Sequence, residues 1–341
     1  MSTKKVTVGF KEKIPRNPPV ASPASPTLQD FLELARLWKP AGTIAFHIPL
    51  IVGALAAVVF VQSPSLHWSA SKLLTLNTYL FLSSFFQRCA ACVWNDAADY
   101  EFDRQVARTR NRPVARGSIS PAIARVYVVA LTITWAAITI GPSPSEALLW
   151  TLLPNFTFHL AYPYMKRITY YPQVFLGFTF SLNVLTGYAM ICDNFTAGLQ
   201  RNTVFGDRNV QVTLALLMLA EMVFTLFYDT IYAYQDLEDD EKAGVGSPAL
   251  VLGVDHGKVA LAWVAVAELG FLVAAGYSLN ACTLYYLLTC GGSAVLAALS
   301  LALCNLRAPE SCSLWFKRCL YWGLISHTAG FVAECIVTGK A

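Results

Sequence analysis

Long apolar segments recur along the whole chain, and they limit its possible folds more than any other feature. A helix that crosses a lipid bilayer needs about 20 mostly apolar residues. The 341-residue sequence contains nine windows of this kind. They lie at residues 41–61, 73–93, 122–140, 145–164, 172–192, 211–231, 259–278, 282–304 and 313–336. This pattern predicts an all-α integral membrane protein with nine transmembrane helices.

The overall composition leads to the same class of protein. Hydrophobic residues make up 55% of the chain and charged residues only 13%, whereas a soluble globular protein carries about 25% charged residues. Residues 1–29 are polar and contain several prolines, which predicts a disordered cytosolic tail. Residues 30–341 are expected to form one membrane domain.

Lysine and arginine residues predict the orientation, because the cytosolic loops of membrane proteins are enriched in them. With the N-terminus in the cytosol, 20 of the 25 fall in cytosolic segments, 4 fall outside, and Arg88 lies within a helix. Asn194 starts an Asn-Phe-Thr sequon on the non-cytosolic side, and its glycosylation is left open. The N-terminal segment lacks the pattern of a mitochondrial transit peptide. We therefore expect the endoplasmic reticulum or Golgi membrane, with the mitochondrial inner membrane as the alternative.

The first of two acidic segments, NDAADYEFD at residues 95–103, directly follows the second apolar window. If the helix continues through it, Asn95, Asp99 and Asp103 lie at positions i, i+4 and i+8. At about 100° per residue these positions drift by only about 80° around the helix axis. One face of the helix would then present a row of oxygen ligands.

The second acidic segment, YDTIYAYQDLEDD at residues 228–240, follows the sixth apolar window. In a continuous helix Asp229, Asp236 and Asp240 lie within roughly 40° of one another. Ordinary solvated loop acids would explain one such segment, but they do not explain two at helix ends on the same side. Carboxylates near a bilayer are costly unless they are paired or bind a cation. Their hard oxygen atoms suit Mg²⁺, which shares its coordination shell with water and phosphate oxygens.

Basic residues accompany the acids on the predicted cytosolic side. Arg108, Arg110 and Arg112 follow the first acidic segment, and Lys166 and Arg167 end the fourth window. Acids, basic residues and an apolar bundle together favour a diphosphate with a long hydrocarbon tail as substrate. For Lys166 and Arg167 a simple positive-inside anchor is the alternative.

At these residues the sequence resembles the UbiA superfamily of membrane prenyltransferases. Residues 95–103 look like its NDxxDxxxD motif, residues 108–113 like RTRxRP, and residues 229–240 like DxxxxxxDxxxD. ARLWKPAG at residues 35–42, YPYMKR at 162–167 and TYYPQ at 169–173 resemble the 4-hydroxybenzoate polyprenyltransferase branch. The resemblance covers about residues 30–336.

The resemblance implies nine transmembrane helices around a central cavity with a cytosolic cap, and it implies roles for particular residues. Two Mg²⁺ ions would be bound by Asn95, Asp99, Asp103, Asp229, Asp236 and Asp240, with Asp99, Asp103, Asp236 and Asp240 as catalytic residues. The diphosphate would be bound by Arg108, Arg112, Lys166 and Arg167. Arg36 is a candidate for binding the carboxylate of an aromatic acceptor, with a membrane-anchoring cation as the alternative.

The predicted reaction is Mg²⁺-dependent transfer of a prenyl group to an aromatic acceptor. The leader and length resemble fungal meroterpenoid enzymes, which attach farnesyl to an orsellinic-acid-type phenol. Alternatives are a 4-hydroxybenzoate polyprenyltransferase of ubiquinone biosynthesis and a membrane terpene cyclase. A transporter is disfavoured because carriers bind their substrates near the bilayer midplane, and nucleic-acid binding is disfavoured because the basic residues follow the membrane topology. His159 is either a base for the reaction or a hydrogen-bonded core histidine, and the oligomeric state is left open.

Overall fold

A computed structural model describes residues 25–60, 70–106, 108–141, 146–165, 167–194, 205–243 and 246–337, which are helical and contain no strand. The long helices are α2 (Pro40–Phe60), α3 (Ala70–Asp103), α5 (Pro121–Ile140), α6 (Glu146–Met165), α7 (Pro172–Asn194), α8 (Arg208–Ala233), α10 (Pro248–Leu279), α12 (Gly291–Leu303) and α13 (Pro309–Val337). The short helices are α1 (Leu28–Leu34), α4 (Pro113–Arg116), α9 (Leu237–Ala243) and α11 (Thr283–Tyr285). A π-helical turn at Tyr286–Cys290 joins α11 to α12.

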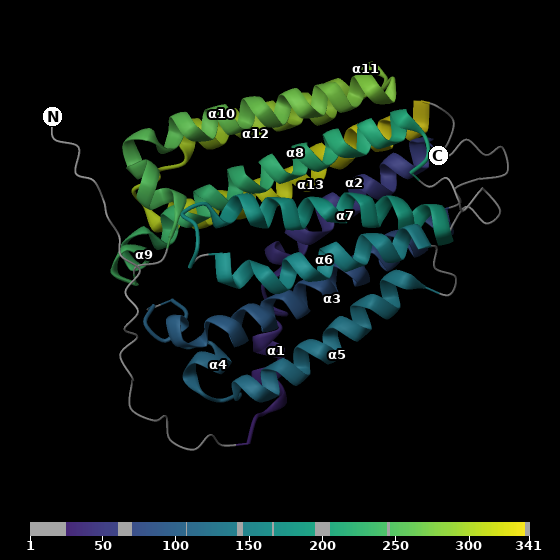
Figure 1. Cartoon of the computed structure of the whole chain (residues 1–341). Coiled ribbons are helices and arrows are strands. Elements are labelled where there is room, and N and C mark those ends of the chain that lie inside the picture. Colours follow the sequence, from purple (N-terminus) through teal and green to yellow (C-terminus); the bar gives the residue numbers. More distant parts are fainter. Residues whose placement is uncertain are drawn as a thin grey trace.

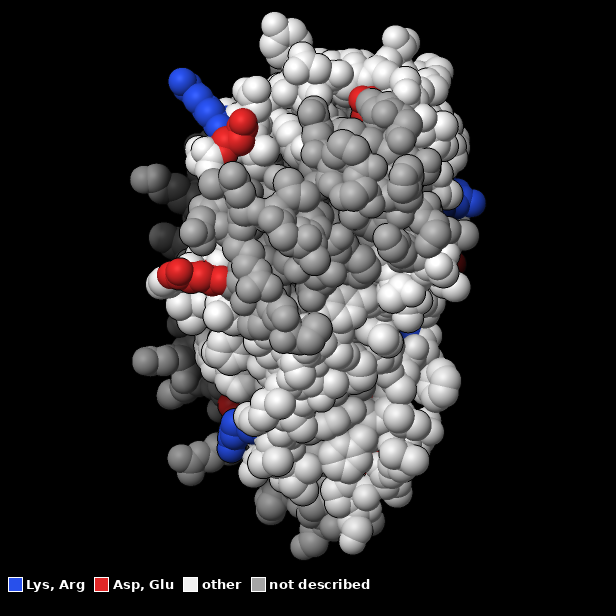
Figure 2. Space-filling view, turned by 90° about the vertical axis from the view of Figure 1, so that its right-hand side faces the viewer, with Lys and Arg blue, Asp and Glu red and all other residues white. Residues whose placement is uncertain are grey.

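The long helices lie side by side in one bundle (Figure 1). α3 packs against α2, α5 and α6, while α7 packs against α2, α6 and α8, and α13 contacts both α2 and α8. The C-terminal ends of α3 and α8 lie at the same end of the bundle as α4 and α9, on the left in Figure 1. Figure 2 shows the opposite end, where the described surface carries only scattered charged side chains. The two segments that carry the acidic motifs therefore meet at one end.

Seven helical runs of the described chain are long and apolar enough to cross a membrane. They correspond to seven of the nine predicted windows. The other two windows are helical as well, in α3 and α6, but these helices are not among the seven. Both carry polar side chains along their length, for example Arg88 and Asp96 in α3 and Asn155 in α6, which lower their apolar character. The membrane class is therefore confirmed, whereas the count of nine spans and the cytosolic cap remain expectations.

Close backbone contact holds α2 against α7 in the middle of the bundle. A Cβ atom added at Gly53 would lie 1.9 Å from the carbonyl oxygen of Val184, and one added at Gly187 would lie 1.9 Å from that of Leu50. Only glycine fits at either position. Small residues at such crossings let membrane helices approach closely, which is a main source of packing energy where water cannot drive association.

A buried amide network joins α3, α6 and α7. The Gln87 amide nitrogen donates to Asn155 Oδ1 at 2.8 Å and to Asn183 Oδ1 at 3.0 Å, and Asn155 Nδ2 donates to Asn183 Oδ1 at 2.6 Å. All three side chains are at most 2% exposed. Because lipid offers no hydrogen-bond partners, these amides pair with one another across three helices.

Candidate active site

α3 continues as a single helix to Asp103, as predicted from the spacing of the first acidic segment. Asn95, Asp99 and Asp103 therefore occupy successive turns of one helix. Asp99 and Asp103 are nearly buried, with 7% and 8% exposure. Charged groups this deep need partners, and the structure shows which partners they have.

The second acidic segment differs from the expected continuous helix. α8 ends at Ala233, a 3₁₀ turn spans Tyr234–Asp236, and α9 begins at Leu237. A 3₁₀ turn has three residues per turn instead of 3.6, so the simple helical spacing does not apply between Asp229 and Asp240. Tyr234 in this turn is buried, and its hydroxyl donates to the Gly253 carbonyl of α10 at 2.7 Å.

Arg108 connects the loop after the first acidic segment to the second one. Its Nε donates to Asp236 Oδ1 at 2.8 Å, and its Nη2 donates to Asp236 Oδ2 at 2.6 Å. The guanidinium also lies over the Tyr232 ring, 5.4 Å from its centroid. This bidentate geometry is the strongest form of an arginine–carboxylate contact. It brings together two motifs that are more than a hundred residues apart in the sequence.

Asp96 lies at the centre of a second charged cluster that the sequence reasoning missed. Its Oδ1 accepts from Arg36 Nη2 at 2.5 Å and from Arg112 Nη1 at 3.0 Å, and its side chain is 2% exposed. Arg112 Nη1 also donates to Asp103 Oδ2 at 2.8 Å. Arg36, the candidate for an aromatic carboxylate, is therefore paired with a carboxylate of the protein itself. The spacing of acids along α3 does not indicate that Arg36 and Arg112 would pair with Asp96 and Asp103.

Positive charge is concentrated beside this cluster. Partial desolvation lowers the pKa of Lys39, and repulsion by Arg36, Arg112 and Arg108 lowers it further. Four cationic side chains thus lie close enough to influence one another. Three of the four are arginines paired with Asp96, Asp103 or Asp236, so a polyanion such as a diphosphate would have to replace these carboxylates.

Arg167 contacts the middle acid of the first segment. Its Nη2 donates to Asp99 Oδ1 at 3.1 Å and to the Ala98 carbonyl at 3.0 Å. The guanidinium also lies over the rings of Phe102, at 4.8 Å, and Tyr164, at 5.3 Å. Arg167 therefore lies beside a predicted metal ligand, whereas Lys166 lies outside the described residues.

Tyr162 of α6 lies near residues of both acidic segments. It lies within electrostatic range of Asp99 on α3 and of Asp229 and Tyr232 on α8. The ends of α3, α6 and α8 therefore converge. Of the six predicted metal ligands, five carboxylates and one amide, each lies on the converging α3 segment or on the α8–α9 segment.

The donor set fits a hard divalent cation in its chemistry. Within the described ranges, no group of three or more His, Cys, Asp or Glu side chains is gathered closely enough to hold a metal ion. Arginines instead pair with Asp99, Asp103 and Asp236. One oxygen ligand is nevertheless ready, because Asn95 Oδ1 is buried and accepts no hydrogen bond from the described part of the chain. A buried acceptor of this kind requires a donor or a cation.

Comparison with known proteins decides the family. The model of the UbiA prenyltransferase family matches residues 43–325. The chain belongs to the UbiA prenyltransferase family. Members of this family are prenyltransferases, so the chain is an enzyme of that class.

Relatives of this UbiA prenyltransferase include fungal proteins. The chain is 32% identical to UbiA prenyltransferase claS of Ampulloclitocybe clavipes, over 84% of each chain. It is 31% identical to the mitochondrial 4-hydroxybenzoate polyprenyltransferase of Schizosaccharomyces pombe, over 85% of this chain and 75% of that protein.

Solved structures share the fold. A UbiA homologue from Aeropyrum pernix has a TM-score of 0.64 at 20% identity, over 86% of this chain and 97% of that one. A homologue from Archaeoglobus fulgidus, bound to DMAPP and Mg²⁺, has a TM-score of 0.59 at 15% identity, over 87% of this chain and 99% of that one. At these identities the likeness establishes the fold of the UbiA prenyltransferase.

The N-terminal helix α1 is clamped onto the same end of the bundle. Arg116 of α4 pairs with Asp30 at 2.7 Å and with Glu33 at 2.8 Å. A capping box formed by Thr27 and Asp30 starts α1. The hydrogen bonds from Thr27, together with Arg116, hold the pKa of Asp30 well below its usual range. This clamp places Arg36, just after α1, beside Asp96.

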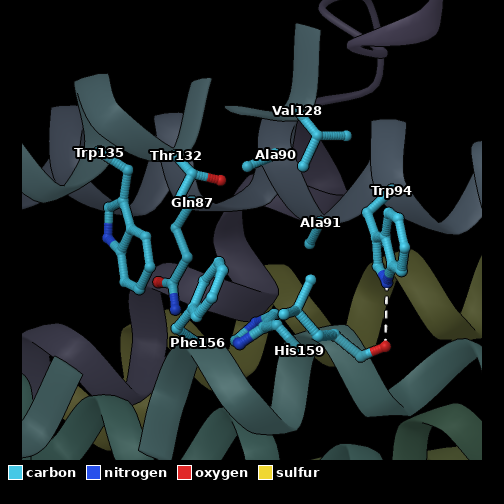
Figure 3. A pocket seen from close by; sticks show the side chains of 10 residues that line it. Gln87, Ala90, Ala91, Trp94, Val128, Thr132, Trp135, Phe156 and His159 are labelled. Atoms are coloured by element: carbon cyan, nitrogen blue, oxygen red, sulfur yellow. Dashed lines mark hydrogen bonds between the residues drawn. The ribbon is translucent and has the colours of Figure 1, made fainter. Parts of the chain in front are cut away.

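His159 has the setting of a core histidine. Its Nδ1 lies 2.7 Å from the Asn155 carbonyl and must donate to it, so Nε2 is left as an acceptor. With Gln87 it lines a cavity of about 20 Å³ between α3, α5 and α6 (Figure 3). Neither His159 Nε2 nor Gln87 Oε1 accepts a hydrogen bond from the described residues. The rest of the cavity lining is mainly apolar and aromatic, with Trp94, Trp135 and Phe156 among its residues. These contacts favour the core interpretation over a role as base.

Replacing Arg108 with lysine tests whether the fork geometry matters. We expect kcat/KM for the prenyl diphosphate to fall by about tenfold, because an ammonium group retains the charge but cannot make the bidentate contact. Steady-state kinetics in detergent or nanodiscs would measure it. Arg110→Lys is the matched control, since Arg110 is an exposed arginine two positions away. Equal activity of both variants would show that Arg108 acts only as a point charge.

Proposed function

We propose that this UbiA prenyltransferase carries out Mg²⁺-dependent transfer of a farnesyl group from farnesyl diphosphate to an aromatic polyketide of the orsellinic-acid type. The product would be a meroterpenoid precursor of secondary metabolism. The observation that carries the proposal is the bidentate bond between Arg108 and Asp236, because it joins both acidic motifs and the basic loop at one end of an apolar bundle. The fungal relative supports the choice of pathway class.

Diphosphate binding is proposed to proceed by an exchange of partners. Arg108 and Arg167 pair with Asp236 and Asp99. A diphosphate offers the arginines phosphate oxygens in the bidentate geometry that guanidinium groups prefer. As the arginines turn to the phosphate, the carboxylates are released to bind cations. The arginines would then neutralise the diphosphate, and the carboxylates would be free to hold its metal ions. Lys166 is proposed to join Arg108, Arg112 and Arg167 as a phosphate ligand.

Metal binding is assigned to oxygen ligands from both segments. Asn95, Asp99 and Asp103 would supply the first set, and Asp229, Asp236 and Asp240 the second. When bound, Mg²⁺ would act as a Lewis acid that stabilises the charge on the departing diphosphate. The structure of the Archaeoglobus fulgidus homologue with DMAPP and Mg²⁺ supports this pairing of ion and substrate. For this chain, Asn95 Oδ1 is the buried acceptor that such an ion would satisfy.

The apolar bundle and its aromatic residues are proposed to protect the reacting allylic carbon. A cationic centre must be kept from water, and aromatic faces can stabilise it. Tyr162 lies within electrostatic range of Asp99, Asp229 and Tyr232, and Tyr162 and Tyr232 are candidates for such faces. A phenol ring carbon would then attack the allylic carbon, and the ring would lose a proton. Asp99, Asp103, Asp236 and Asp240 act in this scheme by holding the diphosphate and its ions in place.

The aromatic acceptor and the host membrane each have a first and a second candidate. Arg36 uses one guanidinium nitrogen for Asp96, so its other N–H groups could donate to the carboxylate of an acceptor. The second candidate reaction is polyprenyl transfer to 4-hydroxybenzoate, and the second candidate location is the mitochondrial inner membrane. Both are supported by the mitochondrial relative from Schizosaccharomyces pombe. We propose the endoplasmic reticulum or Golgi membrane, with the N-terminus in the cytosol.

The deciding experiment uses membranes from cells that express the full chain. They are incubated with Mg²⁺, a dimethylorsellinate-type acid, and farnesyl, geranylgeranyl or longer prenyl diphosphates, with EDTA as the control. We expect EDTA-sensitive farnesylation of the phenol. Turnover only with 4-hydroxybenzoate and long donors would replace the acceptor assignment, and a sesquiterpene formed without acceptor would identify a cyclase.

A further inference from the structure

Three ionisable side chains lie together inside the bundle, away from the candidate active site. His327 of α13 lies between Glu221 of α8 and Glu268 of α10, with Nδ1–Oε1 and Nε2–Oε1 distances of 2.8 and 3.2 Å. The three side chains are 1–5% exposed. Ionisable groups in transmembrane segments are costly and tend to be functional. We call Glu221, Glu268 and His327 the buried triad.

The hydrogen bonds of the buried triad fix a minimum number of protons. Each imidazole nitrogen faces a carboxylate oxygen, so each of the two bonds must contain one proton. Two protons on one imidazole and two carboxylates leave a net charge of −1, wherever the protons reside. A third proton, on a carboxylate oxygen that faces away from His327, makes the triad neutral.

Within the described part of the chain, no lysine or arginine forms an ion pair with the triad. Among the described residues, the titratable groups that interact with it electrostatically are Tyr228 and Tyr285 near Glu221, and Cys290 and Cys319 near Glu268. None of these four groups is cationic. A net charge of −1 in an apolar interior is strongly unfavourable, so the third proton is the least costly way to neutrality.

A continuous series of ring contacts connects the buried triad to the candidate active site. His327 packs against Phe224 at 4.6 Å, and Phe224 packs against Tyr228 at 5.2 Å. Phe316 of α13 lies 5.8 Å from Tyr228 and 4.6 Å from Tyr232. Tyr232 in turn lies beneath the Arg108 guanidinium. These rings therefore pack α8 against α13 between the buried triad and the Arg108–Asp236 pair.

We propose that the buried triad is a proton-binding site that holds three protons, and that its bonds position α8 against α13 and α10 for prenyl transfer. The positioning part rests on the proposed function. The proton-binding part does not, because it concerns the triad alone. Glu221, Glu268 and His327 are positioning residues, since they touch neither the substrates nor the proposed metal ligands.

Infrared spectroscopy tests the third proton without any activity measurement. The purified full chain is compared with Glu221→Gln and Glu268→Gln at neutral pH. We expect the wild type to show a carboxylic-acid C=O band that disappears in one of the two variants. If neither variant loses such a band, the three-proton assignment is overturned.

Two substitution sets test the positioning role. A glutamine resembles a protonated glutamate, so the variant whose band disappears is expected to keep kcat/KM for the prenyl diphosphate within threefold of wild type. The triple variant Glu221→Met, Glu268→Met and His327→Leu replaces the triad with apolar side chains, an exchange that buried ion pairs often tolerate in stability. We expect its kcat/KM for the prenyl diphosphate to fall at least tenfold relative to wild type. The KM for the acceptor should stay within threefold of the wild-type value.

Thermal unfolding separates positioning from simple loss of fold. A triple variant with the wild-type melting temperature and full activity would overturn the positioning role. If the triple variant fails to fold, the glutamine variants decide, and a tenfold loss in the one that lacks the band would contradict the proposal. A wild-type protein with no prenyl transfer under any condition would defeat the proposed function, while the infrared result would still stand.

Discussion

Alanine at Asp99 or at Asp236 is expected to reduce kcat/KM for prenyl transfer by about 10²–10³-fold, the usual effect of removing one preorganised charge from an active site. Each substitution removes a proposed metal ligand and also leaves an arginine, Arg167 or Arg108, without its carboxylate. The Mg²⁺ concentration for half-maximal rate should rise as well. Steady-state assays over a range of Mg²⁺ concentrations measure both effects.

The matched control is Glu238→Ala. Glu238 lies in α9, two residues after Asp236, but its side chain is 90% exposed and its Oε2 lies 3.9 Å from Lys242 Nζ. Exposed pairs of this kind contribute little, so near-wild-type activity is expected. If Asp99→Ala and Asp236→Ala keep full, Mg²⁺-dependent activity, the two acidic segments do not bind the diphosphate complex.

The parts of this site that follow local rules were predictable from the sequence. The i, i+4, i+8 spacing placed Asn95, Asp99 and Asp103 on one helix, and α3 does continue to Asp103. The apolar windows located the long helices because length and hydrophobicity are properties of contiguous residues. The membrane class and the helical fold rest on such information.

Features that depend on distant partners were not predictable. The 3₁₀ turn before α9 contains Tyr234, whose hydroxyl donates to the distant Gly253 carbonyl. The pairing of Asp96 with both Arg36 and Arg112 depends on how α1 and the loop after α3 fold back. In each case the partners are distant in the sequence, and only the packed bundle shows which residues meet.

Replacing Arg88 with methionine is expected to destabilise the protein by about 3 kcal/mol. Arg88 is 2% exposed, and its guanidinium donates to the carbonyls of Ala35, Arg36 and Lys39 at 3.1, 2.7 and 2.9 Å. An unsatisfied buried polar group costs about 1–3 kcal/mol, and water can replace part of the loss at the rim. Methionine keeps the apolar stem of the side chain and removes the donors together with the positive charge.

The effect should be local as well as global. Arg36 has a left-handed backbone, with φ at 54°, which a non-glycine residue adopts only when its surroundings hold it there. Without Arg88 this turn can relax, and the Arg36–Asp96 pair should loosen with it. We expect a lower melting temperature in detergent and faster proteolysis between α1 and α2. Arg125→Met, at an exposed arginine near the start of α5, is the control. Unchanged melting and proteolysis in Arg88→Met would show that α1 is held by the Arg116 clamp alone.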